Sequence, residues 1–175
     1  MECGEGFDRA SLSLLGRQQE LLESLQKTGK PLIVVYIEGR PLEKNWASEY
    51  ADALLTAYYP GQEGGNAIAD VLFGDYNPSG RLPISVPRSV GQIPVYYNQK
   101  APRNHDYVEV SSSPLYSFGY GMSYTTFEYS DLQVVQKSAR CFEVSFKVKN
   151  TGKYDGEEVS QLYMRDEYAS VVQPM

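Results

Sequence analysis

The stretch Lys30-Pro-Leu-Ile-Val-Val-Tyr-Ile37 decides how the first half of the chain folds. Its apolar run at 32–37 is continuous and rich in β-branched side chains, which is typical of a strand buried on both faces in a parallel sheet. A second apolar run follows at 53–58, and a short helix is predicted between the two runs at 45–50. Strands that alternate with helices predict an α/β layered domain.

The flanking segments extend this pattern over residues 10–88. Residues 11–28 carry apolar side chains at helical spacing, and Gly29 stands where a helix ends. Residues 66–73 predict another helix, and residues 81–86 predict a short edge strand because Pro83 lacks an N–H donor. The predicted core consists of Leu21, Leu25, Val34, Val35, Leu54, Leu55, Ile68 and Leu72.

The second half of the chain has a different pattern. Residues 87–124 are rich in proline, tyrosine, serine and asparagine and predict a long ordered connector. After Tyr124 the period becomes two, with strands predicted at 142–149 and 157–165 on either side of a turn. About four strands fit before the end, against seven in a complete β-sandwich, so only half a sandwich is expected.

Composition excludes several classes of function. The 175 residues carry a net charge of −6 and no run of basic residues, so no nucleic-acid partner is expected. His105 is the only histidine, and Cys3 and Cys141 lack zinc-ligand spacing. We therefore expect no metal and no cofactor. No apolar run reaches the roughly 18 residues that span a bilayer.

The glycine cluster in Gly61-Gln-Glu-Gly-Gly65 precedes the helix at 66–73 and raises the question of a phosphate-binding loop. A nucleotide loop needs a following Lys-Ser or Lys-Thr, and a dinucleotide fingerprint needs GxGxxG. Neither pattern is present. We interpret the cluster as scaffold that lets the helix start close to the end of the preceding strand.

Three long blocks, at 29–42, 61–98 and 118–127, strongly resemble family 3 glycoside hydrolases, the β-glucosidase and β-xylosidase type. The resemblance implies that residues 1–88 are the C-terminal part of an α/β sandwich domain and residues 89–125 a connector. Residues 126–175 would then be the first half of a fibronectin type III-like β-sandwich. The barrel domain of the family, which carries the nucleophile, would lie outside this chain.

Retaining glycosidases need two carboxyl groups about 5–5.5 Å apart, one as nucleophile and one as acid/base. The family commonly places the acid/base glutamate on a sandwich-domain loop, and Gly4-Glu-Gly-Phe-Asp-Arg9 matches that loop. The resemblance therefore makes Glu5 the candidate acid/base, with Glu2 as its neighbouring alternative. Asp8 and Arg9 are interpreted as a local ion pair that shapes the loop, and His105 matches no catalytic histidine of the family.

The expected partner is a β-glycoside or oligosaccharide substrate, and the chain alone is expected to be inactive without the barrel. Trp46, Tyr96, Tyr97 and Tyr107 are candidates for stacking on sugar rings, although packing is the favoured explanation for each of them. The alternative function is a non-catalytic carbohydrate-binding or scaffolding module. Sugar binding by the isolated chain would favour that alternative.

Overall fold

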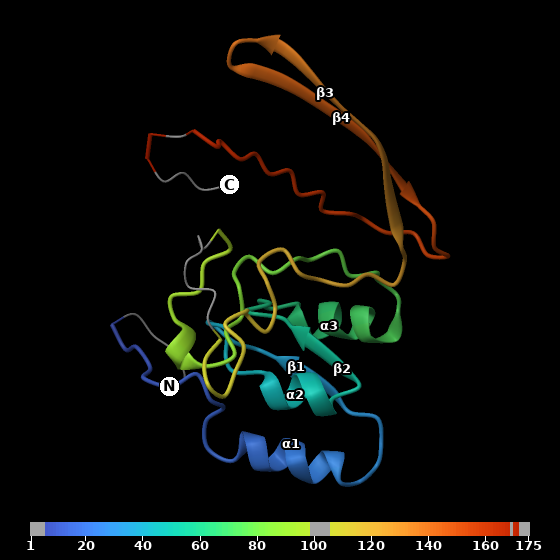
Figure 1. Ribbon diagram of the computed structural model, residues 1–175. Coiled ribbons are helices and arrows are strands. Elements are labelled where there is room, and N and C mark those ends of the chain that lie inside the picture. The colour runs from blue at the N-terminus through green and yellow to red at the C-terminus, as the bar shows by residue number, and fades with distance from the viewer. Residues whose placement is uncertain (1–5, 99–105, 169, 172–175) are drawn as a thin grey trace.

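The computed structural model describes residues 6–98, 106–168 and 170–171 (Figure 1). The elements are α1 (Gln18–Gln26), β1 (Ile33–Tyr36), α2 (Asn45–Tyr50), β2 (Ala53–Thr56), α3 (Gly64–Phe73), a 3-10 turn (Val90–Gln92), β3 (Phe127–Ser138) and β4 (Cys141–Asn150). Within these described ranges no helix is long and apolar enough to cross a membrane.

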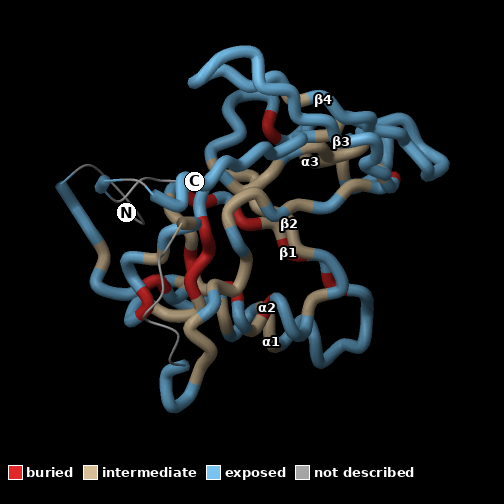
Figure 2. The backbone as a smooth tube through the Cα atoms, turned by 45° about the horizontal axis from the view of Figure 1, so that its top comes forward, coloured by how far each residue is buried: buried red, intermediate tan, exposed pale blue. Residues whose placement is uncertain are grey.

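The first half is a layered α/β structure. β1 pairs with β2 in parallel, in a register that opposes Ile33 to Ala53 and Tyr36 to Thr56. Figures 1 and 2 show α1 and α2 on one side of this sheet and α3 on the other. The predicted alternation of strands and helices is confirmed, because a parallel pair needs a crossover and α2 supplies it.

The prediction that β1 is buried on both faces is wrong for the described chain. Val34 and Tyr36 are buried, but Ile33 is 50% exposed and Ile37 is 57% exposed. Side chains alternate between the faces of a strand, so one face is covered and the other is open. The buried face packs in a cluster with Leu32, Leu42 and Ala47.

The predicted core was only partly right. Of its eight members only Val34 is buried, while Val35, Leu54, Leu55 and Ile68 are half-buried. Leu21, Leu25 and Leu72 are exposed. Helical spacing correctly gave each helix an apolar face, but no described element covers those faces fully (Figure 2).

Two glycines explain where the helices begin and end. The helix predicted at 11–28 starts only at Gln18, because Gly16 adopts φ +58° and turns the chain just before it. α3 ends at Gly74, whose left-handed φ of +86° is the usual glycine cap. Residues 11–15 lie outside the helix, and there Leu12 is buried.

The edge strand predicted at 81–86 does not form. Val86 makes one isolated antiparallel bridge to Tyr116, and the Leu82 N–H bonds the Tyr120 carbonyl at 2.8 Å. Pro83 has no N–H to donate, so a continuous ladder cannot form between these two contacts. The connector therefore lies against residues 82–86 without becoming a strand.

The second half is a long antiparallel hairpin of β3 and β4 that stands away from the α/β layers (Figure 1). Its alternating sequence predicted β4 correctly. The strand predicted at 157–165 is wrong, because that segment forms no backbone ladder with either strand of the hairpin. Side chains hold it instead, through Arg81 to Glu158 at 2.7 Å and Gln161 to the Gly119 carbonyl at 3.1 Å.

Candidate functional site

The parallel pairing of β1 and β2 brings the carboxyl ends of both strands to one edge of the sheet. Residues 38–44, which we call the exit loop, leave β1 at this edge. The Glu38 N–H donates to the Tyr58 carbonyl at 3.2 Å and so joins the exit loop to the segment that follows β2. Open α/β sheets bind ligands outside the carboxyl ends of their strands, which makes this edge the candidate site.

A buried ion pair stiffens the exit loop. The Lys44 ammonium lies 2.5 Å from the Glu38 carboxylate, and both side chains are 2% exposed. The same carboxylate accepts from the Leu42 N–H at 3.1 Å and from the Thr56 hydroxyl at 3.3 Å. Buried charges need such partners, and here one carboxylate fixes both ends of the loop to β2.

The surroundings shift the pKa values of three neighbouring groups. Burial lowers the pKa of Lys44, although the hydrogen bond and charge of Glu38 oppose this shift. Burial, and then the charges of Glu38 and Tyr116, raise the pKa of Tyr36 to about 12. Burial and Glu38 also raise the pKa of Tyr58. Glu38 and Lys44 are occupied with each other, so they support the loop rather than offer a free acid or base.

Residues 8–13, which we call the strap, lie along the exit loop. The Glu43 N–H donates to the Leu12 carbonyl at 2.8 Å, and the Ser13 hydroxyl donates to the Glu43 carboxylate at 3.1 Å. Leu12 is buried at the centre of this contact. Arg9 closes the strap on itself by donating to the Ser13 carbonyl at 2.5 Å.

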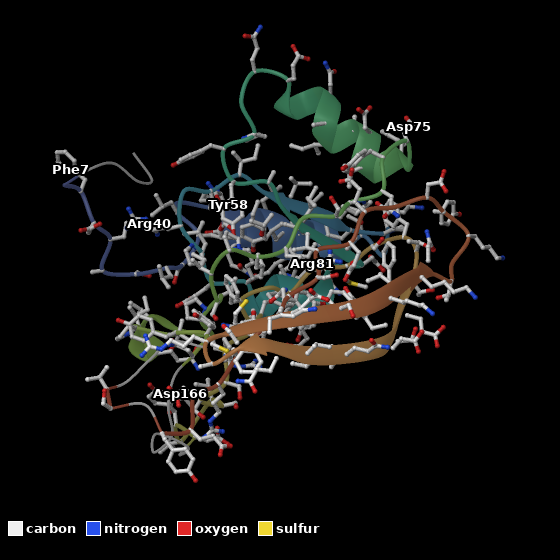
Figure 3. All side chains as sticks on the ribbon, turned by 90° about the horizontal axis from the view of Figure 1, so that it is seen from above. Phe7, Arg40, Tyr58, Asp75, Arg81 and Asp166 are labelled. Atoms are coloured by element: carbon white, nitrogen blue, oxygen red, sulfur yellow. The ribbon has the colours of Figure 1, made fainter. Side chains whose placement is uncertain are left out.

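Arg40 links the exit loop to the first residue of the strap. Its Nη1 lies 3.6 Å from Asp8 Oδ1, and the side chains of Arg40 and Asp8 are 24% and 94% exposed. Arg40 Nε and Arg9 Nη1 are buried and have no hydrogen-bond acceptor among the described residues. Figure 3 shows Arg40 on the same side of the molecule as Phe7, with Tyr58 nearby. This edge therefore holds two guanidinium groups with unused donors.

The predicted catalytic residue Glu5, its alternative Glu2 and His105 lie outside the described residues. The interpretation of Asp8 and Arg9 as a local ion pair is wrong, because Asp8 pairs with Arg40 and Arg9 bonds a backbone carbonyl. Sequence reasoning missed Arg40 altogether. Gly39-Arg-Pro41 was interpreted only as the end of a strand. The sequence pattern did not predict a contact between Arg40 and Asp8.

The glycine cluster before α3 is tightly packed. Gly64 is buried, and a Cβ added there would come within 2.5 Å of the Pro60 ring. Only glycine fits such an approach, which agrees with the scaffold interpretation. Glu63 does not extend into the candidate site as a free carboxylate, since it accepts from Asn66 at 2.7 Å.

Three of the four aromatic candidates for sugar stacking have a ring contact or a hydrogen bond among the described residues. Trp46 packs against the buried cluster, and its ring centroid lies 5.1 Å from that of Tyr50. Tyr97 lies 4.9 Å from Phe118, and the Tyr107 hydroxyl donates to the Gly91 carbonyl at 3.1 Å. Packing is thus favoured for these three, while Tyr96 is 63% exposed.

A hollow of about 520 Å³ lies elsewhere, beyond the end of α3. Its lining consists of Phe73, Gly74, Asp75, Asn77, Tyr124, Tyr154 and Asp155. Both ends of the Asn77 amide are engaged there, because it donates to the Asp155 carbonyl at 2.9 Å and accepts from the Tyr124 N–H at 2.8 Å. Figure 3 shows Asp75 on the opposite side of the molecule from Arg40, so the hollow is separate from the candidate site.

Comparison with known proteins gives a consistent result. The model of the glycosyl hydrolase family 3 C-terminal domain matches residues 1–124. The chain is 47% identical over 97% of its length to a β-xylosidase of Formosa agariphila, and 46% identical over 98% to a periplasmic β-glucosidase of Salmonella typhimurium. A solved β-glucosidase structure from Erythrobacter marinus superposes with a TM-score of 0.87 at 47% identity, over 95% of this chain and 23% of that one. The chain spans 24% of each of the two curated relatives, about a quarter of their length.

Proposed function

This chain belongs to glycosyl hydrolase family 3, and we propose that it is part of an enzyme that hydrolyses β-linked glucosides or related oligosaccharides. Within that enzyme it supplies the loop of the general acid/base. The two relatives named above are a β-xylosidase and a β-glucosidase, which supports a β-glycoside as the substrate class.

In the proposed reaction Glu5 acts twice. It first donates a proton to the glycosidic oxygen as the leaving group departs and a barrel carboxylate outside this chain attacks the sugar. It then takes a proton from the water that releases the sugar from the covalent intermediate. A glutamate suits both steps because partial desolvation by substrate raises a carboxyl pKa toward neutrality.

One observation carries this proposal. The strap begins three residues after Glu5 and is held at the carboxyl edge of the parallel strands, where Asp8 meets Arg40. A loop anchored at that edge can carry a carboxyl group over the pocket of a neighbouring domain, and Gly4 and Gly6 give it the freedom to do so. Gly6 adopts φ +74°, a conformation that side chains other than glycine rarely take.

We also propose the domain division that the resemblance implies. Residues 1–88 form the C-terminal part of the α/β sandwich domain, residues 89–125 the connector, and residues 126–175 the first half of a fibronectin type III-like module. The long hairpin of β3 and β4 supports the last assignment, since antiparallel hairpins build such sandwiches.

The second candidate function is carbohydrate binding without catalysis. The hollow beyond α3 favours it, because Phe73 is 84% exposed and Tyr154 61% exposed beside Asp75 and Asp155. Aromatic faces suit the C–H side of a pyranose, and carboxylates accept from its hydroxyls. Calorimetric titration of the isolated chain with cello-oligosaccharides would reveal this function as saturable heat that Phe73→Ala abolishes.

The deciding experiment uses an active enzyme that contains this chain, such as a chimera in which residues 1–175 replace the matching segment of the Salmonella relative. Glu5→Gln should lower turnover by about 10² to 10⁴, the usual contribution of acid–base assistance. The loss in the glycosylation step should be smaller for substrates with good leaving groups. Azide should partly restore turnover, because it attacks the glycosyl-enzyme without help from a base.

Glu2→Gln is the matched control on the same loop and should behave like the parent enzyme. If Glu2→Gln shows the azide rescue instead, the acid/base is Glu2. If neither variant shows it, the acid/base lies outside this chain. The isolated chain should not hydrolyse aryl β-glucosides, and measurable hydrolysis by it would contradict the proposed division of labour.

A further inference from the structure

We infer that Arg40 is a positioning residue for the acid/base loop and acts on it through Asp8. The inference deepens the proposed function and rests on it for the identity of the catalytic group. It concerns three residues in series: Arg40 on the exit loop, Asp8 at the start of the strap, and Glu5 three residues upstream.

The exit loop is a rigid base for this series. Glu38 is buried and ties the loop to β2, to Leu42 and to Lys44 through three side-chain contacts. Arg40 stands in the middle of this loop with a side chain that is only 24% exposed. A guanidinium held in this way keeps its orientation, because neighbouring atoms leave few other rotamers open.

The strap is fastened to the same loop at two points. Its far end is held by the Leu12 carbonyl and the Ser13 hydroxyl, both of which bond Glu43. Its near end is held by Asp8, whose carboxylate lies 3.6 Å from Arg40 Nη1. The Asp8 side chain is 94% exposed. The Asp8–Arg40 contact is therefore the anchor nearest to Glu5 within the described chain.

The anchor affects Glu5 because only a short segment of chain separates Asp8 from Glu5. Three residues of extended chain span at most about 10 Å, so the position of Asp8 bounds the region that Glu5 can reach. A displacement of about 1 Å in a catalytic group lowers rates by up to roughly 10². An ion pair at the surface is weak, so losing it should change the population of the productive loop position by no more than a few-fold.

Arg40 retains a further donor for the same task. Its buried Nε has no acceptor among the described residues. Buried donors are nearly always met by a protein acceptor or an ordered water, so this N–H is available for a second contact. A lysine at this position would keep the charge but lose this second donor.

The test uses the active chimera with Arg40→Ala, Arg40→Lys, Asp8→Asn and the Arg40→Ala/Asp8→Asn double variant. Arg17→Ala is the matched control, because Arg17 is also paired with a carboxylate, Glu20, but lies at the start of α1. Asp8→Asn changes a side chain that is 94% exposed, so it tests the contact even if Arg40→Ala does not fold.

Two readouts distinguish positioning from a structural role. Arg40→Ala and Asp8→Asn should each speed amide hydrogen exchange of residues 6–10 several-fold, with Arg40→Lys in between and Arg17→Ala unchanged. They should also lower kcat by roughly 2- to 5-fold for substrates with poor leaving groups, with a smaller loss for good ones and little change in KM. The double variant should lose no more than Arg40→Ala alone, because both changes remove the same contact.

Wild-type exchange and wild-type kcat in Arg40→Ala and Asp8→Asn would overturn the inference. So would a kcat loss that is equal for good and poor leaving groups, or additive losses in the double variant. Failure of the proposed function looks different. In that case Glu5→Gln keeps its turnover, while exchange of residues 6–10 still responds to Arg40→Ala.

Discussion

Lys44 and Glu38 form an ion pair at 2.5 Å from which water is almost entirely excluded. The ammonium also lies 4.5 Å from the centre of the Tyr36 ring, so it contacts the last residue of β1 as well as the exit loop. Cation–π contacts strengthen when the cation is desolvated. One lysine thus joins the strand to the loop that carries Arg40.

Removing one member of this pair should destabilise the α/β layers strongly. We expect Lys44→Met to cost about 3–5 kcal/mol, because it leaves the Glu38 carboxylate buried without a counter-charge. Native-state hydrogen exchange of the β1 amides measures this loss. A Glu38→Gln/Lys44→Met double variant should lose less than the sum of the two single changes, and strict additivity would contradict the coupling.

Stability should depend on Tyr36 at alkaline pH. Its pKa is raised from 10.0 to about 12 in the folded chain, so the folded state holds the phenolic proton more tightly than the unfolded state. This contribution is complete below pH 10 and is lost as the pH rises toward about 12. Tyr36→Phe should remove it. The free energy of unfolding of wild type minus that of Tyr36→Phe should therefore fall across this window, and a constant difference would contradict the assignment.

Much of the secondary structure was predictable because its causes are local. α2 was predicted at its observed bounds, and both ends of each parallel strand and of α3 were predicted within two residues. Apolar spacing fixes the type of an element, and Gly74 fixes where α3 stops. Burial was less predictable, since Leu21 and Leu72 sit on apolar helix faces that no described element covers.

Contacts in the candidate site between residues far apart in the sequence were also not predictable. The resemblance proposed Glu5, which lies outside the described residues, but the contact between Asp8 and Arg40 was not predictable. Asp8 has an oppositely charged neighbour in sequence at Arg9, yet it pairs with Arg40. That contact exists only because the parallel strands bring the exit loop and the strap to the same edge. The spacing of residues 8 and 40 in the sequence does not predict that they are close in space.

Arg81 and Glu158 should couple the hairpin half to the α/β half. They lie 2.7 Å apart with side chains 12% and 17% exposed, and Glu158 also accepts from the Tyr129 hydroxyl at 2.9 Å. Arg81→Ala should cost about 1–3 kcal/mol, because it leaves a poorly solvated carboxylate without its main partner. Limited proteolysis after residue 156 should become faster. Arg140→Ala, at the tip of the hairpin, is the control and should leave the cleavage rate unchanged.

The two faces of β1 should respond differently to truncation. Val34→Ala should cost roughly 1–3 kcal/mol, because Val34 is 8% exposed and its loss leaves a cavity in the buried cluster. Ile33→Ala should cost much less, since Ile33 is 50% exposed. Val35 is half-buried and should fall between them. Equal losses at positions 33 and 34, measured by hydrogen exchange of β2, would show that the open face is covered in solution.

The last prediction concerns association of the isolated chain through the hairpin. β3 and β4 pair only with each other among the described residues, so each leaves an outer edge with unpaired backbone groups. Exposed apolar side chains lie along these strands, with Leu132 at 67%, Val134 at 60% and Phe142 at 50%. An open edge beside apolar surface promotes pairing between chains. Sedimentation velocity should therefore show concentration-dependent oligomers of the isolated chain.

Val134→Lys should weaken that association, because a charge on an edge strand opposes pairing with a second chain. Leu21→Lys is the matched control, as Leu21 is equally exposed at 58% but lies on α1. It should leave the oligomers unchanged. A sharp monomer at all concentrations, together with strong amide protection at residues 142–149, would mean that the hairpin is stable alone. If both lysine variants weaken association equally, net charge rather than the hairpin edge controls it.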